Sequence, residues 1–260
     1  MTAAGDPRPR CPPDCVVPAA GGGVAGGGVG DSVHLVVVSD AHLLGPEDPE
    51  QAALCAFLDG LRCDRLVLLG DMLHAGWTWG GPHPDHHPFF SALERTCARG
   101  VAVCWVPGNH DFGVQVPPAV QAAGPHVVDC DGRRLLLAHG DEPDRSVGYR
   151  ALRGVLRSRA FSGLVRGLGP DRGMALLRRI AGPRHPPEAA PPRALVTAQR
   201  EWAARQLRDP GLDGVIMGHS HVLGEVALPG GTLWHTGAWL GLRSWLEVID
   251  GQVRLHGAGG

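Results

Sequence analysis

Five short segments of the chain carry the residues best suited to metal-dependent chemistry. In order, they read Asp40-Ala41-His42, Gly70-Asp71, Gly108-Asn109-His110-Asp111, His139-Gly140-Asp141 and Gly218-His219-Ser220-His221. Carboxylate and amide oxygens and imidazole nitrogens are ligands for hard and borderline divalent ions, and no thiolate accompanies them here. The seven candidate metal ligands are Asp40, His42, Asp71, Asn109, His139, His219 and His221.

Short runs of β-branched or aliphatic residues precede these segments, and such runs predict buried strands. The runs are 33–38, 66–69, 101–106, 135–138 and 215–217. Because the carboxyl ends of buried strands open into loops at one edge of a sheet, ligands placed there converge on one cleft. Each motif alone is common in turns and loops. The ordered set, with its members placed after strands, is what indicates a metal site.

The ordered set resembles the calcineurin-like metallophosphoesterases, whose pattern is D-x-H, GD, GNH[DE], a lone H and GHxH, and the resemblance extends from about residue 33 to residue 250. It implies an α/β fold, a four-layer α/β/β/α sandwich in which helices flank two packed sheets. It also implies two divalent metal ions, with Mn²⁺ favoured and Fe²⁺, Co²⁺ or Zn²⁺ compatible with the ligand types. The implied ligand sets are Asp40, His42 and His221 for one ion and Asn109, His139 and His219 for the other, with Asp71 bridging both.

Phosphate ester hydrolysis explains why such a site needs these residue types. Two cations about 3.5–4 Å apart can bind a phosphoryl oxygen, activate a water and stabilise an in-line displacement. By the resemblance, His110 faces the leaving-group oxygen and donates a proton or stabilises its charge. Asp111 is expected to orient that imidazole, so His110 and Asp111 are the candidate catalytic residues. The alternative for His110 is a supporting role beside the ligands without proton transfer.

Composition agrees with a compact enzyme. The chain has 260 residues and 43% hydrophobic content, enough for one domain with an insertion. A net charge of −2 and a sequence pI near 6.7 argue against a nucleic-acid partner. No apolar run approaches a membrane span, and residues 1–30 lack the apolar core of a signal peptide, so we expect a cytoplasmic protein. Seven cysteines without zinc-site spacing fit a reduced compartment.

The chain divides into a leader and one domain. Residues 1–30 are rich in proline and glycine and predict a disordered leader, which leaves residues 31–260 for the metallophosphoesterase domain. After Asp71, a loop carries Trp77 and Trp79, which we expect to wall the substrate cleft. The same loop carries three histidines that either bind a further metal or, as is commoner for loop histidines among prolines, face solvent: His83, His86 and His87.

The segment from Arg145 to about Ala181 is strongly basic. It holds nine arginines against the single acid Asp171, with leucines and valines between them at helical spacing. Gly169-Pro170 predicts a break between two helices. We expect a helical hairpin lid, inserted within about residues 145–190, that overhangs the cleft. It either binds an anionic head group, acyl chains or an anionic membrane surface, or is a packing hairpin with a solvated arginine face.

The local sequence around the lid resembles the UDP-2,3-diacylglucosamine diphosphatases of lipid A biosynthesis. HGD is followed by a Y-x-x-x-R element at Tyr149 and Arg153, and then by an Arg/Leu-rich hairpin. The resemblance implies that Tyr149 and Arg153 bind the substrate and that the lid holds its lipid. It also implies peripheral contact with the inner membrane. The chain departs from that family because arginine is common where it has His110, and because it contains no lysine.

Three functional hypotheses follow. The first is hydrolysis of the pyrophosphate of UDP-2,3-diacylglucosamine to UMP and 2,3-diacylglucosamine 1-phosphate. The second is a phosphatase or phosphodiesterase that acts on a soluble ester, in which the hairpin is only a cover. The third is a non-catalytic, metal-stabilised scaffold. All seven candidate ligands and His110 are present, which favours the enzymes over the scaffold.

Overall fold

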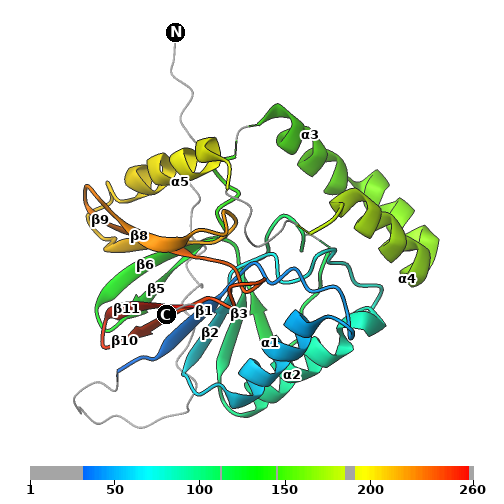
Figure 1. Cartoon of the computed structure of the whole chain (residues 1–260), viewed down its shortest axis with the longest axis horizontal. Coiled ribbons are helices and arrows are strands. Elements are labelled where there is room, and N and C mark those ends of the chain that lie inside the picture. The colour runs from blue at the N-terminus through cyan, green and yellow to red at the C-terminus, as the bar shows by residue number, and fades with distance from the viewer. Residues whose placement is uncertain (1–31, 112, 145, 185–190, 258–260) are drawn as a thin grey trace.

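The computed structural model describes residues 32–111, 113–144, 146–184 and 191–257. Two β-sheets pack face to face, with helices α1 (Pro49–Gly60) and α2 (His87–Ala98) on one outer side and α5 (Arg193–Gln206) on the other (Figure 1). The four-layer α/β/β/α sandwich expected from the sequence is therefore confirmed. The expected leader at residues 1–30 lies outside the described residues.

The order of strands places every ligand segment at one end of the sandwich. The strands are β1 (Leu35–Val38), β2 (Arg65–Leu68), β3 (Ala102–Trp105), β4 (Val120–Ala122), β5 (His126–Cys130), β6 (Arg133–Ala138), β7 (Gly214–Met217), β8 (Leu223–Leu228), β9 (Gly231–Thr236), β10 (Trp245–Ile249) and β11 (Gln252–His256). One sheet has the order β11-β10-β1-β2-β3-β4 and the other β5-β6-β7-β9-β8. Because β1, β2 and β3 run parallel, as do β6 and β7, their carboxyl ends share an edge in each sheet. The five predicted strand runs correspond to these five strands.

Burial on both faces explains why β1 is an unbroken apolar run. Leu35 and Val37 pack in the cluster between the two sheets, whereas Val36 and Val38 pack in the cluster under α1 and α2. All four side chains are fully buried. A strand covered on both faces carries no polar side and therefore shows no alternation. A third cluster joins the second sheet to α5, so each layer boundary has its own core.

The lid consists of helices α3 (Val147–Leu156) and α4 (Arg159–Ala181), which lie beyond one end of the sandwich, at the right of the view (Figure 1). Gly169 is non-helical, with φ 74° and ψ 178°, so the predicted break near Gly169-Pro170 is present as a kink within α4. The turn between α3 and α4 comes earlier, before Ser158, whose hydroxyl accepts from the Phe161 amide and caps α4. The sequence pattern missed this second break.

Two tryptophans of the loop after β2 pack against helix α4 of the lid. Trp77 is buried in a cluster with Phe161, Val165 and other lid residues. The indole Nε1 of Trp79 donates to the Val165 carbonyl at 3.1 Å. Neither tryptophan lines the pocket described below. The prediction that Trp77 and Trp79 wall the substrate cleft was therefore wrong, because their large apolar surfaces are covered by α4.

The loop histidines have structural roles. His83 and His86 are buried, so the interpretation that they face solvent was wrong. The Nδ1 of His86 lies 3.2 Å from Gln51 Oε1, and the exposed His87 contacts the carbonyl of Pro82 through Nε2. Within the described ranges, the candidate metal groups include none of these three histidines.

Candidate metal centre and active site

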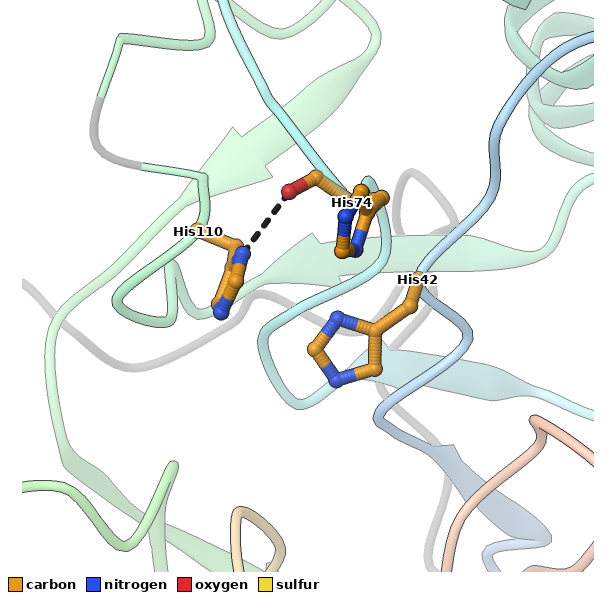
Figure 2. A group of neighbouring side chains, drawn as sticks. All are labelled: His42, His74 and His110. Atoms are coloured by element: carbon orange, nitrogen blue, oxygen red, sulfur yellow. Dashed lines mark hydrogen bonds between the residues drawn. The ribbon is translucent and has the colours of Figure 1, made fainter. Parts of the chain in front are cut away.

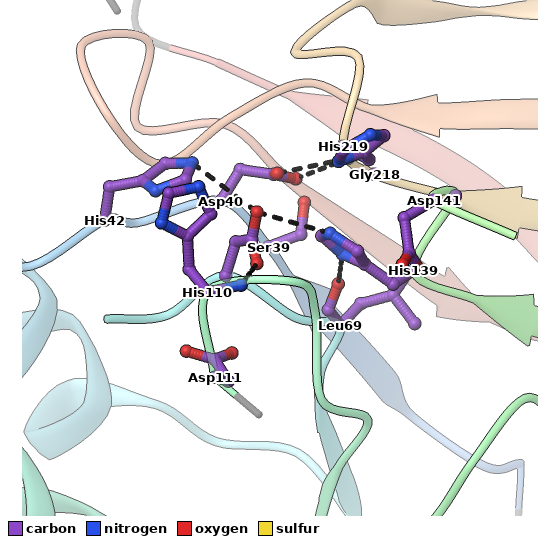
Figure 3. Close-up of polar contacts among 12 residues, drawn as sticks. Ser39, Asp40, His42, Leu69, His110, Asp111, His139, Asp141, Gly218 and His219 are labelled. Carbon is purple, nitrogen blue, oxygen red and sulfur yellow. Dashed lines mark hydrogen bonds and ion pairs between the residues drawn. The ribbon is translucent and has the colours of Figure 1, made fainter. Parts of the chain in front are cut away.

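The loops after β1, β2, β6 and β7 bring six of the seven candidate ligands into two groups. Asp40, His42 and His221 form one group, and Asp71, His139 and His219 form the other, each with its donor atoms within 4.8 Å of one another. Figure 3 shows side chains from these separate loops converging.

The spacing of the donor atoms within these groups is that of a ligand shell. The Nε2 atoms of His42 and His221 are 3.3 Å apart, and Asp40 Oδ1 lies 3.5 Å from His221 Nε2. Metal–ligand bonds of about 2.1 Å give ligand–ligand edges of about 3.0–3.4 Å in octahedral and tetrahedral geometry. The group is therefore nearly preformed for a cation.

Asp71 lies between the two groups. Its Oδ2 is 3.4 Å from His139 Nε2 and 3.9 Å from His42 Nε2. Its Oδ1 accepts from the backbone amide of His110 at 2.8 Å, which fixes the orientation of the carboxylate. One oxygen of Asp71 therefore faces a histidine from each group, as a bridging carboxylate requires.

Most of the ligand backbones are held in an uncommon conformation. Five candidate ligands have positive φ angles between 45° and 66°: Asp40, His42, Asp71, His219 and His221. The left-handed region costs a non-glycine residue roughly 1–2 kcal/mol, and such strain persists where the surrounding fold determines it, often at functional sites. The packed strands and the loop hydrogen bonds therefore hold these ligands in place although their backbones would favour negative φ angles.

Motif glycines let the carboxylates approach neighbouring loops. A Cβ atom at Gly108 would overlap the carboxylate of Asp71, and one at Gly218 would overlap the carboxylate of Asp40. Gly218 also precedes the amide of His219, which donates to both oxygens of Asp40 at 3.0 and 3.1 Å. The glycines in GNHD and GHSH are thus required by close packing at the site.

Two buried carboxylates give the site the negative charge that suits a cation. Burial opposes the ionisation of Asp40 and Asp71, but the surrounding imidazoles outweigh it and lower the pKa of both carboxyls. Burial also opposes protonation of His139, yet Asp71 raises the pKa of His139 well above its usual value. Burial lowers the pKa of His42 to about 3 and lowers that of His219, so both imidazoles are neutral and keep a free lone pair.

Unpartnered buried atoms provide a direct test of whether these residues fit a metal ion. Asn109 Oδ1 and His139 Nε2 are buried and have no hydrogen-bond partner among the residues that the structure describes. The Nδ1 of His139 donates to the Leu69 carbonyl at 2.8 Å, so Nε2 is the ring nitrogen that a metal ion would bind, in exchange for the proton that the raised pKa places there. A buried polar atom without a partner costs about 1–3 kcal/mol. A divalent cation bound by these two atoms would satisfy both, so the residues fit a metal ion.

His110 and Asp111 have different partners from those expected. The Nδ1 of His110 donates to the carbonyl of His74 at 2.7 Å (Figure 2). Both oxygens of Asp111 accept backbone amides, from Met72 and Leu73, at 3.1 Å. Burial and the nearby Asp71 raise the pKa of Asp111 to about 7. The expectation that Asp111 orients the His110 imidazole was wrong, since the His74 carbonyl does so and Asp111 holds the loop after β2.

The two predicted substrate contacts share one partner. The Tyr149 hydroxyl donates to Asp141 Oδ2 at 2.6 Å, and Arg153 Nη1 lies 3.2 Å from the same oxygen. Burial and Asp141 raise the pKa of Tyr149, so the phenol keeps its proton. Asp141, from the HGD motif, therefore ties α3 to the loop that carries His139. Tyr149 and Arg153 also line the pocket beside the metal groups.

The pocket has a polar end and an apolar end. Its volume is about 140 Å³, and Asn109, His110 and His74 line the end nearest the candidate metal groups. Ala75 and Gly76 follow His74 along the wall, and the other lining residues belong to the lid: Tyr149, Leu152, Arg153, Leu156, Arg157, Leu177, Ile180 and Ala181. A phosphate-sized group at the polar end would therefore continue directly into an apolar surface edged by arginines.

Some residues that build the site carry no sequence motif. The buried Gln199, on α5, donates through Nε2 to the carbonyls of Gly140 and Gly218 at 3.0 and 3.1 Å. It thereby joins the two motif loops of the second sheet. His74 was visible in the sequence as part of the tryptophan- and histidine-rich loop, but its contact with His110 depends on how that loop folds.

Comparison with known proteins agrees with this geometry. The UDP-2,3-diacylglucosamine hydrolase of Aeromonas salmonicida is 29% identical over 197 residues, covering 73% of this chain and 78% of the relative. The protein of the same name from Xanthomonas campestris pv. campestris is 35% identical over 136 residues, covering 48% and 53% respectively. The family model described as calcineurin-like phosphoesterase matches residues 33–223. The protein is a metal-dependent hydrolase of phosphate esters, and the chain belongs to the calcineurin-like phosphoesterase family.

Proposed function

We propose that the protein is a dinuclear-metal phosphoesterase that hydrolyses the pyrophosphate of UDP-2,3-diacylglucosamine, giving UMP and 2,3-diacylglucosamine 1-phosphate. The observation that carries this proposal is the pocket in which His110 and Asn109 share a cavity with Leu152, Leu156 and the lid arginines. A lipid-linked diphosphate needs both a charged end and an apolar end. The relatives with that activity in their names support the same substrate.

Two divalent ions are proposed, with Mn²⁺ the first choice and Fe²⁺, Co²⁺ or Zn²⁺ compatible with the donors. Their proposed ligands are Asp40, His42 and His221 for one ion, Asn109, His139 and His219 for the other, and Asp71 for both. When bound, such ions polarise a phosphoryl oxygen and lower the pKa of a water. Asp111 supports this arrangement indirectly, because its hydrogen bonds hold the two residues that follow Asp71.

His110 is the proposed proton donor to the leaving group. Because a carbonyl oxygen only accepts, the hydrogen bond to His74 places a proton on Nδ1 of His110. That leaves Nε2 as the nitrogen available to a substrate in the pocket. A protonated Nε2 donates to the leaving oxygen, and the neutral ring that remains keeps its bond to His74.

The lid is the proposed lipid-binding element. Among the described residues, the large apolar side chains most exposed to solvent are mostly on the lid: Val147, Leu152, Val155, Leu164 and Ile180. Exposed arginines, including Arg150 and Arg166, lie on the same helices. Apolar side chains flanked by arginines suit the surface of an anionic bilayer. We therefore propose peripheral contact with the cytoplasmic face of an inner membrane. None of the described helices has the length and hydropathy of a membrane span.

The experiment that tests this function is product analysis. Purified protein is incubated with Mn²⁺ and UDP-2,3-diacylglucosamine, and UMP and the lipid phosphate are identified by mass spectrometry. Bis(4-nitrophenyl) phosphate serves as the soluble ester. UMP release supports the proposal. Hydrolysis of the soluble ester alone would favour the soluble-ester alternative, and no hydrolysis by protein carrying two metals per chain would favour the scaffold.

A further inference from the structure

We infer that His74 is a positioning residue that couples the seating of the lid's carboxyl-terminal end to the orientation of His110. This inference rests on the proposed role of His110 at the leaving group. His74 follows Asp71 by three residues and is buried between the lid and the candidate metal groups.

The first step of the coupling joins His74 to the lid. The Nε2 atom of His74 lies 2.8 Å from the carbonyl oxygen of Gly182, the residue that ends α4 with φ 72°. A carbonyl only accepts, so the proton of this hydrogen bond is on Nε2 of His74. The Nδ1 of the same ring is buried and has no partner within the described part of the chain. The bond to Gly182 is therefore the polar contact that sets the direction of this imidazole.

The second step joins the same residue to His110. The carbonyl oxygen of His74 accepts from Nδ1 of His110 at 2.7 Å, and the two rings stack at 5.6 Å with an interplanar angle of 27°. Figure 2 shows His74 and His110 facing each other above His42. Two hydrogen bonds and one ring contact thus connect Gly182 to the proposed proton donor. The inferred coupling acts through the ring contact and through the position of the His74 carbonyl.

Two arginines also hold the carboxyl-terminal end of the lid. The position of this end can therefore be changed without a substitution at His74. Arg178 donates to the Leu44 carbonyl and to Asp85 at 2.7 and 2.6 Å. Arg184 pairs with the buried carboxylate of Asp48 at 2.9 Å. Arg184 also donates to the backbone carbonyl of the proposed ligand His42 at 3.5 Å, so the metal content of each Arg184 variant is measured as well. Removing Arg184 should loosen the lid end while leaving the side chains of His74 and His110 unchanged. If His74 transmits the position of the lid end to His110, removal of Arg184 and removal of the His74 side chain must both alter the orientation of the His110 imidazole.

The kinetic test uses His74→Leu, which removes the donor to Gly182, and His74→Gln, which keeps a terminal N–H donor of similar reach. The substrates are the 4-nitrophenyl and phenyl esters of uridine 5′-monophosphate, since only the poorer leaving group, phenol, depends strongly on a proton donor. With two metals retained, His74→Leu should lower kcat for the phenyl ester by roughly 10–100-fold. The loss for the nitrophenyl ester should be smaller, KM should change little, and His74→Gln should recover most of the activity.

The matched control is His87→Leu, because exposed His87 also contacts a backbone carbonyl through Nε2, away from the site. It should leave both esters unaffected. A double variant of His74→Leu with Arg184→Leu then tests the relay. Arg184→Leu should lower phenyl-ester kcat in the wild-type background and add little in the His74→Leu background. Independent, multiplicative effects would overturn the inference, as would unchanged leaving-group dependence in His74→Leu.

A readout that does not need activity separates this inference from the proposed function. Nitrogen-15 NMR of the histidine rings, with the His110 signal assigned from a His110→Gln variant, reports which nitrogen carries the proton. We expect Nδ1–H of His110 in the wild type and in His74→Gln, and averaged tautomers in His74→Leu. An unchanged His110 tautomer in His74→Leu would refute the coupling even if both esters are hydrolysed. Absence of UMP release from UDP-2,3-diacylglucosamine by metal-loaded wild type would instead refute the proposed function, and the NMR result would still decide the coupling.

Discussion

Replacing Asp71 with asparagine should disrupt both metal groups at once. The amide oxygen of Asn can still accept from the His110 backbone amide, as Asp71 Oδ1 does at 2.8 Å. The amide nitrogen then takes the place of Oδ2, which faces His139 at 3.4 Å and His42 at 3.9 Å. An amide N–H cannot serve as a ligand, so the substitution keeps the shape of the site and removes the shared donor atom.

The size of the effect follows from the two metal–carboxylate bonds that a bridging oxygen makes. Hydrogen bonds to charged groups are worth about 1.5–3 kcal/mol each, and we take this as a lower bound for a metal–carboxylate bond. Removing both bonds then costs about 3–6 kcal/mol, or roughly 10²–10⁴-fold in combined metal affinity. Elemental analysis after dialysis against limiting Mn²⁺ and isothermal titration calorimetry would measure the loss.

Two controls make the result specific. Asp40→Asn changes a carboxylate of only one group, so it should weaken mainly one ion. Asp85→Asn changes a carboxylate that pairs with lid residue Arg178, and it should retain both ions. Full occupancy by two metals with wild-type affinity in Asp71→Asn would refute the bridging role.

The remaining predictions concern proton donation, the lid and pH. His110→Gln should keep both metals and lower kcat by roughly 10²–10⁴-fold for alkyl leaving groups, and equal losses for nitrophenyl and alkyl esters would exclude the leaving-group role. Replacing residues 147–181 with a Gly/Ser linker should leave metal content intact but abolish turnover of the lipid-linked nucleotide and binding to anionic vesicles, whereas retained vesicle binding in sedimentation assays would place the membrane contact elsewhere. Because Asp71 raises the pKa of His139 well above its usual value, metal must displace a proton there. Metal affinity should therefore weaken as pH falls, and calorimetry in two buffers of different ionisation enthalpy should detect proton release; affinity independent of pH would contradict this interpretation.

The fold and the candidate ligands were largely predictable because their signals are local. A buried strand such as β1 appears in the sequence as an apolar run, and a ligand such as Asp40 follows directly after it. Parallel pairing of such strands then places their ends at one edge. The residue types that can bind a metal therefore stand directly after the apolar runs that predict where they lie in the fold.

Contacts between distant segments could not be predicted in the same way. Trp77 was expected to wall the cleft, but the packing of α4 makes it a support for the lid. Asp111 is adjacent to His110 in sequence, yet its carboxylate points to amides after β2, and the carbonyl of His74 holds the imidazole instead. Gln199 carries no motif because its role depends on α5 packing over two loops. Such roles are set by tertiary geometry, which residue spacing does not encode.

One pocket joins the candidate metal centre to the lid that we propose binds lipid. The most direct test compares kcat/KM for UDP-2,3-diacylglucosamine with that for UDP-N-acetylglucosamine, which shares the diphosphate and sugar but lacks the long acyl chains. Burying about four methylenes against the apolar lid residues is worth about 3 kcal/mol, or roughly 100-fold. We predict a preference of at least that size for the acylated substrate, and its loss when residues 147–181 are replaced. Equal kcat/KM for the two substrates would contradict the claim.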